Sequence, residues 1–413
     1  MDKLSILYIT PSVAIPSFHG SSTHVLELSR NLVKLGCNVI VLARRLPAQS
    51  PSEVIEGIKV FRIWRGMFKA VSTDSLQVTS DFTRKYLKPL EGLYFNTVYA
   101  AFVSSLAFYL TNKYKVNVIL ERGDSYCTGA FVSLVSGIPL ITEIRDVYQP
   151  KISLIVAKKL LVYDASILKD KKFLSKTAIM HGGVDVEKFK PMGKQDAKAA
   201  LGLLNKFVIG YSGSFAPSHK LDIMITLAER LQKVYDSKVH FLIVGPANPQ
   251  LLKTVRSLNL EHHFSFVGSI FHDELPKYLN AMDVGLALYN PNMIAGPPYK
   301  VYEYMACGVP AITTETIYSR KFVKNGLNGF LVRMNNIEDI LNKIILLIEN
   351  PNLLNEISVK ARETALKFSW KEETSRILNL LKSVYASSAC ASHDRSTSKP
   401  NHGSRKPKVF GSR

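Results

Sequence analysis

The sequence predicts an α/β protein of two domains, each built on a parallel sheet. Its 413 residues exceed one ordinary core, since a domain usually takes roughly 100–200 residues. Short runs rich in β-branched residues alternate with helical patterns, which is typical of parallel sheets covered by helices. A polar stretch with Pro191, residues 182–204, separates two such sets and indicates a hinge.

The first set predicts an N-terminal domain over residues 1–183. Its predicted strands are 5–10, 38–43, 116–121, 140–143 and 177–180. Residues 23–35 place apolar side chains on one helical face and stop at Gly36, as an amphipathic helix does. The apolar stretch 93–110 is about long enough to span a bilayer, but its polar residues and the strand after it favour a buried helix.

The second set predicts a C-terminal domain over residues 184–369. Its predicted strands are 207–211, 240–244, 264–267, 284–287 and 311–313, and its predicted helices include 221–234, 337–349 and 353–368. A last helix is expected over 371–386. From residue 388 to 413 the chain is poor in apolar residues and rich in Ser, Lys and Arg, which predicts a disordered basic tail.

The charge predicts a phosphate-bearing partner. The formal net charge is +20, from 53 Lys plus Arg against 33 Asp plus Glu, and such a surface attracts nucleic acid, anionic lipid or phosphorylated substrates. Four scattered cysteines without a CxxC pair indicate no zinc site and a reducing, cytoplasmic location. Segments 61–69 and 151–176 mix cations with aromatic or apolar residues, which suits an anionic bilayer; a solvated basic face is the alternative.

Two glycine-containing loops are candidate anion sites. Gly20 lies at the start of the first predicted helix, where backbone amides can bind an anion, although a plain tight turn has the same composition. In the second domain, Gly213 and Ser214 follow a predicted strand and Lys220 begins the next helix. A lysine is unfavourable against the dipole at that end of a helix, so Lys220 is expected to bind a ligand diphosphate rather than to be only a solvated surface lysine.

A third segment, residues 296–310, predicts a rigid turn followed by a helix. Pro298, Tyr299 and Lys300 lie at the turn, and Glu303 lies one helical turn further on. A carboxylate in that place can accept hydrogen bonds from two ribose hydroxyls.

Phrases along nearly the whole chain, to about Ala386, resemble the retaining GT-B glycosyltransferases of family four. They are HVLEL at 24–28, GCNV at 36–39, GGVD at 182–185, FVG at 266–268, KVYEYMACGVP at 300–310, NGLNGFLV at 325–332 and FSW at 368–370. The resemblance implies two Rossmann-like domains facing across a cleft, with the last helix, 370–387, crossing back to the first domain. It also implies donor binding mainly by the second domain, with Lys220 on the diphosphate, Glu303 on the ribose and Gly20 near the phosphates or the sugar.

The sequence departs from this family at three places. The first Glu of the E-x7-E motif falls at Ala295, the usual Arg of the second domain falls at Ser214, and a usual His falls at Arg122. Residues 298–303 match the Pro-x-Lys-x-x-Glu version that some members use instead. Lys300 and Arg122 are then expected to supply the missing positive charge, so Lys220, Arg122 and Lys300 are the predicted catalytic residues. The predicted donor-binding residues are Gly20, Gly213, Ser214, Lys220, Pro298, Tyr299, Lys300 and Glu303.

The function predicted is transfer of a sugar from a UDP- or GDP-linked donor to a cell-envelope glycan or lipid-linked acceptor, with retention. We expect no cofactor and no metal, because no Asp-x-Asp pair offers ligands. A nucleotide-sugar epimerase of the same fold and a non-catalytic nucleotide-sugar-binding protein are the alternatives. An NAD-dependent oxidoreductase is disfavoured because no Gly-x-Gly-x-x-Gly follows a predicted strand, and nucleic-acid binding ranks last because no known module accompanies the charge.

Overall fold

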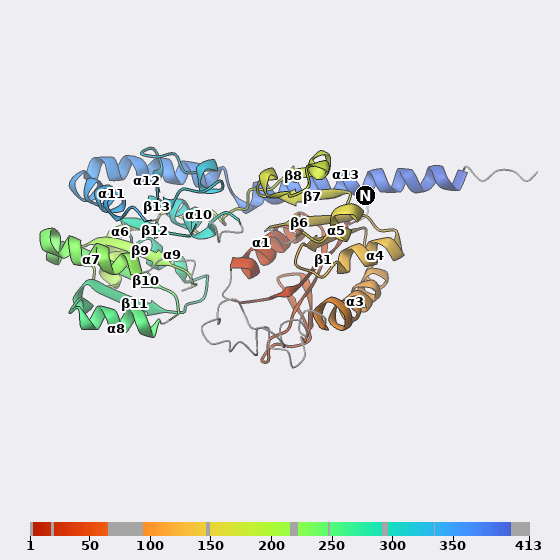
Figure 1. Cartoon of the computed structure of the whole chain (residues 1–413), viewed down its shortest axis with the longest axis horizontal. Coiled ribbons are helices and arrows are strands. Elements are labelled where there is room, and N and C mark those ends of the chain that lie inside the picture. Colours follow the sequence, from red (N-terminus) through yellow and green to blue (C-terminus); the bar gives the residue numbers. More distant parts are fainter. Residues whose placement is uncertain are drawn as a thin grey trace, which may run out of the picture.

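The structure consists of two α/β domains, each arranged around its own sheet (Figure 1). It is a computed structural model. The residues that it describes are 3–17, 20–64, 94–145, 149–214, 222–246, 248–290, 296–333 and 335–397.

The N-terminal sheet has eight strands in the order β3-β4-β2-β1-β5-β6-β7-β8. They are β1 (Ser5–Ala14), β2 (Asn38–Arg44), β3 (Ser52–Ile55), β4 (Ile58–Ile63), β5 (Val118–Arg122), β6 (Leu140–Ile144), β7 (Lys159–Val162) and β8 (Thr177–Ile179). All neighbours pair in parallel except β3 and β4, which form a hairpin. The strands β3, β4 and β7 were not predicted.

Strand β4 corrects one prediction about the bilayer. Residues 61–69 were expected to suit an anionic membrane, but Arg62 is buried in β4 and donates to the carbonyl oxygens of Ile15 and Ser50. Its guanidinium also pairs with Glu53 on β3. The first part of this segment is therefore structural, and residues 65–69 lie outside the described residues.

Helices cover both faces of the N-terminal sheet. Helices α1 (Gly20–Lys34) and α13 (Trp370–Thr397) contribute to one core cluster with β1 and β2. Helices α3 (Ala100–Lys113), α4 (Thr128–Ser136) and α5 (Lys151–Val156) contribute to the other, and a π-helix, Phe95–Tyr99, precedes α3. Most of the apolar stretch 93–110 thus belongs to these two segments. No helix among the described residues has the length and apolar character needed to cross a membrane.

Helix α13 returns from the second domain and runs along the first (Figure 1). The sequence predicted its end near residue 387 and disorder from 388, but the helix continues to Thr397. The helix is thus ten residues longer than predicted, and the disorder of the tail stays a prediction. Residues 398–413 are not among those that the structure describes.

The C-terminal sheet has six parallel strands in the order β11-β10-β9-β12-β13-β14. They are β9 (Phe207–Ser212), β10 (Val239–Val244), β11 (Phe264–Gly268), β12 (Val284–Ala287), β13 (Ala311–Thr314) and β14 (Gly329–Val332), of which β14 was not predicted. Its α-helices are α6 (Lys194–Ala200), α7 (Asp222–Tyr235), α8 (Pro249–Ser257), α9 (Leu275–Leu279), α10 (Tyr299–Ala306), α11 (Ile337–Glu349) and α12 (Pro351–Leu366).

Single turns of 3-10 helix complete the described elements. In the N-terminal domain they are Ala165–Ile167 and Lys171–Lys176, and in the C-terminal domain Asp236–Lys238, Glu261–His263 and Ser319–Lys321.

The chain crosses between the domains twice, and the two crossings pair with each other. The Val184 amide donates to the Phe368 carbonyl over 3.0 Å, and the Trp370 amide donates to the Val184 carbonyl over 3.1 Å. A Cβ at Gly183 would lie 2.8 Å from the Trp370 nitrogen, so only glycine allows this approach. The hinge predicted over 182–204 was too long, because α6 and the buried Phe189 belong to the C-terminal domain.

Candidate active site at the domain junction

Both sheets have the strand order in which a ligand site is expected. In a doubly wound sheet, ligands bind beyond the carboxyl ends of the two strands where the strand order reverses. That place is β1/β5 in the first domain and β9/β12 in the second. Arg122 is the last residue of β5, and Gly213 directly follows β9. The fold therefore places two of the predicted site residues at its two switch points.

Lys300 carries a buried cation beside Gly213. Its Nζ lies 4.0 Å from the ring centroid of Tyr211 and 5.3 Å from that of Tyr289. A Cβ on Gly213 would approach that Nζ to 2.9 Å, so the absence of a side chain there makes room for the ammonium group. The Nζ is buried, and no described residue hydrogen-bonds to it. Two predicted donor-binding residues, Gly213 and Lys300, thus lie close together, and no carboxylate among the described residues hydrogen-bonds to the Lys300 ammonium group.

Burial also controls the charge of Lys300. Burial lowers the pKa of Lys300 to about 7, although the nearby Glu303 acts in the opposite direction. The ammonium form is therefore poised near neutral pH, and an anion arriving beside it would favour that form.

Glu303 lies one turn further along α10 and is held by a histidine that the sequence did not reveal. Its Oε1 is 2.7 Å from Nε2 of His272, which follows β11. Burial alone would lower the pKa of His272, but the Glu303 carboxylate raises it above its ordinary value. The two residues lie 31 positions apart in the chain, so no local motif joins them. His272 fixes the orientation of the carboxylate predicted to bind ribose.

The backbone amides after β9 are largely used within the protein. The Ser212 amide donates to the Tyr304 hydroxyl over 2.8 Å, and the Gly213 amide donates to the Val244 carbonyl over 2.9 Å. The Ser214 carbonyl accepts a hydrogen bond from Tyr211. A cradle of amides over residues 212–214, the anion site expected from the sequence, is therefore wrong for residues 212 and 213. The positive charge at this loop comes from Lys300 instead.

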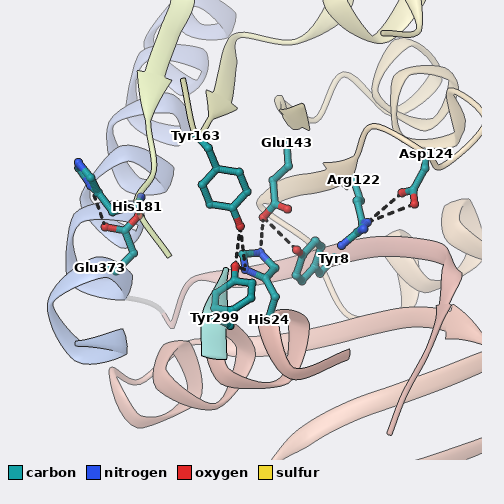
Figure 2. Close-up of polar contacts among 9 residues, drawn as sticks. All are labelled: Tyr8, His24, Arg122, Asp124, Glu143, Tyr163, His181, Tyr299 and Glu373. Carbon is teal, nitrogen blue, oxygen red and sulfur yellow. Dashed lines mark hydrogen bonds and ion pairs between the residues drawn. The ribbon is translucent and has the colours of Figure 1, made fainter. Parts of the chain in front are cut away.

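Tyr299 reaches from the second domain into the first (Figure 2). Its hydroxyl lies 2.6 Å from the Tyr163 hydroxyl and 2.9 Å from Nδ1 of His24. Its ring stacks on Trp370, and a Cβ on Gly20 would lie 3.8 Å from its Cδ2. Gly20 and Tyr299, both predicted to bind the donor, are thus neighbours across the junction, and the Tyr299 hydroxyl joins the domains.

His24 connects this contact to a buried carboxylate. The carboxylate of Glu143 accepts a hydrogen bond from Tyr8 over 2.9 Å and lies 3.3 Å from Nε2 of His24. Burial lowers the pKa of His24 to about 4. Burial would raise the pKa of Glu143, but His24 and Arg145 beside it lower that pKa to about 2. At pH 7 the neutral His24 ring therefore donates from Nε2 to ionised Glu143 and accepts at Nδ1 from Tyr299.

Arg122 has a partner in its own domain. Its Nε lies 3.1 and 3.2 Å from the two carboxylate oxygens of Asp124 (Figure 2). Asp124 also accepts a hydrogen bond from Ser12 over 2.7 Å. The Nη1 atom of Arg122 is buried and has no hydrogen bond within the described chain. The charge of this predicted catalytic residue is therefore largely compensated.

Two of the predicted site residues remain, Pro298 and Lys220. Pro298 precedes the first turn of α10 and is buried, so it sets where that helix begins. Lys220 and Ala295 lie outside the described residues, and the role of Lys220 stays a prediction.

One group of metal-ligand side chains occurs in the described part of the chain, and it is not at this site. Asp236, His262 and His263 have ligand atoms within 4.8 Å of one another. They precede β10 and β11, at the edge of the sheet opposite to the carboxyl ends.

The second domain matches a known family. Residues 193–364 fit the family model described as glycosyl transferases group 1. This matched range contains Gly213, Lys300 and Glu303.

Curated relatives are similar at low identity. The chain is 26% identical over 211 residues to a D-inositol 3-phosphate glycosyltransferase of Rhodococcus erythropolis, covering 48% of this chain and 46% of that protein. It is 27% identical over 199 residues to a UDP-Gal:alpha-D-GlcNAc-diphosphoundecaprenol alpha-1,3-galactosyltransferase of Escherichia coli, covering 45% and 49%. These matches span about half the length of each relative. An uncharacterized glycosyltransferase of Methanocaldococcus jannaschii, MJ1069, is 23% identical over 402 residues, covering 90% and 96%.

Solved structures show the fold. Anabaena Alr3699/HepE in complex with UDP and glucose aligns with a TM-score of 0.68 at 18% identity, covering 92% of this chain and 100% of that one. Sucrose-phosphate synthase from Thermosynechococcus elongatus aligns with a TM-score of 0.70 at 18% identity, covering 93% and 100%. The predicted GT-B fold is therefore confirmed: two α/β domains with parallel sheets and a final helix that returns to the first domain.

Proposed function

We propose that this chain, with its glycosyl transferases group 1 domain, transfers a sugar from a nucleotide-sugar donor to an acceptor hydroxyl. The observation that carries the proposal is the buried ammonium group of Lys300 beside Gly213, with Glu303 one helical turn away. A buried cation without a protein anion is costly, and a bound diphosphate would compensate it. The GT-B fold and the matched domain support the same activity.

The donor is proposed to bind along the start of α10. The diphosphate would lie at Lys300 and the sequence-predicted Lys220, and the Glu303 carboxylate would accept hydrogen bonds from ribose hydroxyls. His272 would keep that carboxylate in place. A UDP-linked sugar is the first candidate, because UDP is the nucleotide bound in the similar HepE structure.

Charge stabilisation is the proposed source of catalysis. As the bond between the anomeric carbon and the donor phosphate breaks, the acceptor oxygen bonds to that carbon and the nucleoside diphosphate leaves with the bonding electrons. Negative charge grows on the diphosphate, where the Lys300 ammonium group lies in a low-dielectric surrounding and stabilises it. Retention of configuration and a reaction without metal are part of the proposal and are drawn from the family resemblance.

A cell-envelope glycan or a lipid-linked sugar is the proposed acceptor. Two similar proteins carry names with such acceptors: the Escherichia coli diphosphoundecaprenol galactosyltransferase and a poly(ribitol-phosphate) alpha-N-acetylglucosaminyltransferase of Staphylococcus aureus. On this basis we place the reaction at the cytoplasmic face of a membrane.

Donor binding and turnover together test the function. A panel of UDP-, GDP- and ADP-sugars is screened for a rise in the midpoint of thermal unfolding, and the stabilising sugar is then assayed for release of nucleoside diphosphate with and without glycan acceptors. We expect one donor to stabilise the wild type and not Lys300→Met. Conversion of the sugar to an epimer without acceptor would indicate the epimerase instead. Stabilisation without any turnover would indicate a binding protein.

A further inference from the structure

Helices α3, α4 and α5 form one layer on the outside of the N-terminal domain. Helix α4 packs against both α3 and α5, and Figure 1 shows α3 and α4 side by side at the end of the molecule away from the second domain. Their inner faces bury residues such as Val103, Val132 and Leu154 against the sheet. On the outer faces of these helices, large apolar side chains are exposed.

The outer faces of these helices carry a concentration of exposed apolar side chains. Nine large apolar residues are exposed on α3, on the π-helix before it, and on α4 and α5: Val98, Phe102, Phe108, Tyr109, Phe131, Leu134, Val135, Ile152 and Ile155. The most exposed are Val135 at 73%, Ile155 at 65% and Leu134 at 63%. Scattered apolar residues on a surface are ordinary, but a group on three adjacent helices marks an interaction site.

The charged side chains of these three helices have one sign, although Asp170 of a neighbouring segment lies near Lys151. Helices α3, α4 and α5 contain no Asp or Glu. Lys113 ends α3, Lys151 begins α5, and Lys158 follows α5; all three are exposed. The Lys113 Nζ lies 5.5 Å from the ring centroid of Tyr109, with its stem beside the apolar patch. Apolar and aromatic groups that enter a bilayer surface, with lysines that reach anionic headgroups, are the pattern of a peripheral membrane contact.

We propose that the outer patch of α3, α4 and α5 docks the protein on an anionic phospholipid bilayer. The proposal rests on the proposed function in so far as a lipid-linked acceptor needs the enzyme at a membrane. A symmetric dimer through the same patch is disfavoured, because both copies would bring lysines to the interface and these helices supply no carboxylate to pair with them.

The location of the patch fits this use. In a parallel α/β sheet the helices run opposite to the strands, so the first turns of α3, α4 and α5 lie at the carboxyl ends of the strands. The Tyr99 hydroxyl at the start of α3 donates to the Pro11 carbonyl in the last part of β1. Val98 and Phe102, both exposed, flank that contact. The patch reaches this edge, at which Arg122 lies, and extends from it to the last turns of α3 and α4, where Lys113 and Val135 are exposed. A bilayer on the patch would therefore cover the outer side of the helix layer along with this edge.

Flotation with vesicles tests the docking. The full chain is mixed with vesicles of phosphatidylcholine alone, or of phosphatidylcholine with an equal part of phosphatidylglycerol, and the floating fraction is measured. Val135→Asp is compared with Val234→Asp, a matched control on α7, since the two valines are 73% and 72% exposed and both lie near a helix C-terminus. We expect the wild type and Val234→Asp to float with the anionic vesicles, and Val135→Asp to lose roughly tenfold in vesicle affinity. Lys151→Glu should weaken the dependence on anionic lipid.

Three results would overturn the docking proposal. The first is equal flotation of Val135→Asp and the wild type, and the second is no flotation of the wild type. The third is a wild-type dimer in sedimentation that Val135→Asp converts to a monomer, which would assign the patch to a second copy. Stabilisation by the donor sugar is measured on the same variants. Retained donor binding with lost flotation separates this patch from the donor site, and absent donor binding in the wild type would count against the proposed function alone.

Discussion

Arg122 and Lys300 occupy comparable places in the two domains but differ in their partners. Each lies beside the switch point of its own parallel sheet. Arg122 shares its charge with Asp124, which Ser12 holds in place. Lys300 has aromatic neighbours and no hydrogen-bond partner among the described residues. The comparison indicates that the Lys300 site of the second domain is prepared for an anion, whereas the charge of Arg122 in the first domain is largely compensated by Asp124.

Replacing the unpaired cation should give the largest effect. Lys300→Met keeps the length of the side chain and removes the charge, so transfer should fall about 100- to 1,000-fold. The thermal midpoint should stay equal or rise, because an uncompensated buried cation is removed. Turnover numbers and unfolding curves of the same preparation check both parts.

Arg122→Met is the matched variant in the first domain. It leaves Asp124 without its cation, so it should lower the free energy of unfolding by about 1–3 kcal/mol. Donor affinity should stay within about twofold of wild type, since the Arg122 guanidinium already pairs with Asp124 and is not held ready for a diphosphate. If Arg122→Met abolished donor binding and Lys300→Met did not, the contrast between the two domains would be reversed.

The carboxylate of Glu303 should matter next. Glu303→Gln keeps the shape but loses the charged acceptor, so donor affinity should fall by about tenfold, as for one hydrogen bond to a charged group. Calorimetric titration with the stabilising nucleotide sugar measures it. Glu315→Gln, whose wild-type carboxylate pairs with Arg320 in the same domain, serves as the control. Equal affinity of Glu303→Gln and wild type would leave Glu303 a purely structural role beside His272.

Donor binding should depend on pH through Lys300, which distinguishes the cation of the second domain from Arg122. Because burial lowers the pKa of Lys300 to about 7, much of the free protein carries a neutral amine just above that pH. A diphosphate favours the ammonium form, so binding must take up a proton there, and affinity should fall by up to about tenfold per pH unit above the free pKa. Calorimetry in buffers of different ionisation enthalpy counts the proton. Lys300→Met should show no such uptake, and uptake that survives this substitution would assign the proton to another group.

A smaller effect is expected from the contact between the domains. Tyr299→Phe removes the hydroxyl that meets Tyr163 and His24 and should lower the free energy of unfolding by about 1–2 kcal/mol. Urea unfolding compared with Tyr385→Phe, an exposed tyrosine of α13, checks it. An unchanged midpoint would mean that the hydroxyl of Tyr299 adds nothing to the other contacts between the domains, such as those of Lys321 with Tyr163 and Asp164.

Acid should weaken the same contact. Burial lowers the pKa of His24 from 6.5 to about 4. Between these two pH values His24 is therefore protonated in the unfolded chain and neutral in the folded chain. Stability is therefore lost as pH falls from about 6.5 towards 4, by at most about 3 kcal/mol. His24→Asn should flatten this part of the curve of unfolding free energy against pH. A curve as steep as that of the wild type would contradict a neutral His24.

The sequence predicted those features that depend on neighbouring residues. Regular apolar runs located β1, β2, β9 and most other central strands, and the spacing from Pro298 to Glu303 located the start of α10. The strands β7 and β14 were missed, since four residues give a weak pattern, although β12 and β13 of the same length were found.

Contacts between distant residues could not be predicted. The Ser212 amide is satisfied by Tyr304, 92 positions later, so an amide that looked available for a ligand is not. His272 beside Glu303 is a second case. In both cases the packing of sheets and helices brings the two residues together, and a local sequence motif does not contain that information.

Helix α13 has a consequence for the order in which the two domains fold during synthesis. Ile377, Leu378, Leu381 and Val384 complete the core that β1, β2 and α1 begin. Although the first domain is synthesised first, its interior stays open until the ribosome has translated through Val384. The two domains then complete folding together. A nascent chain halted before Trp370 would expose the apolar surface that α13 covers, which chaperones could bind.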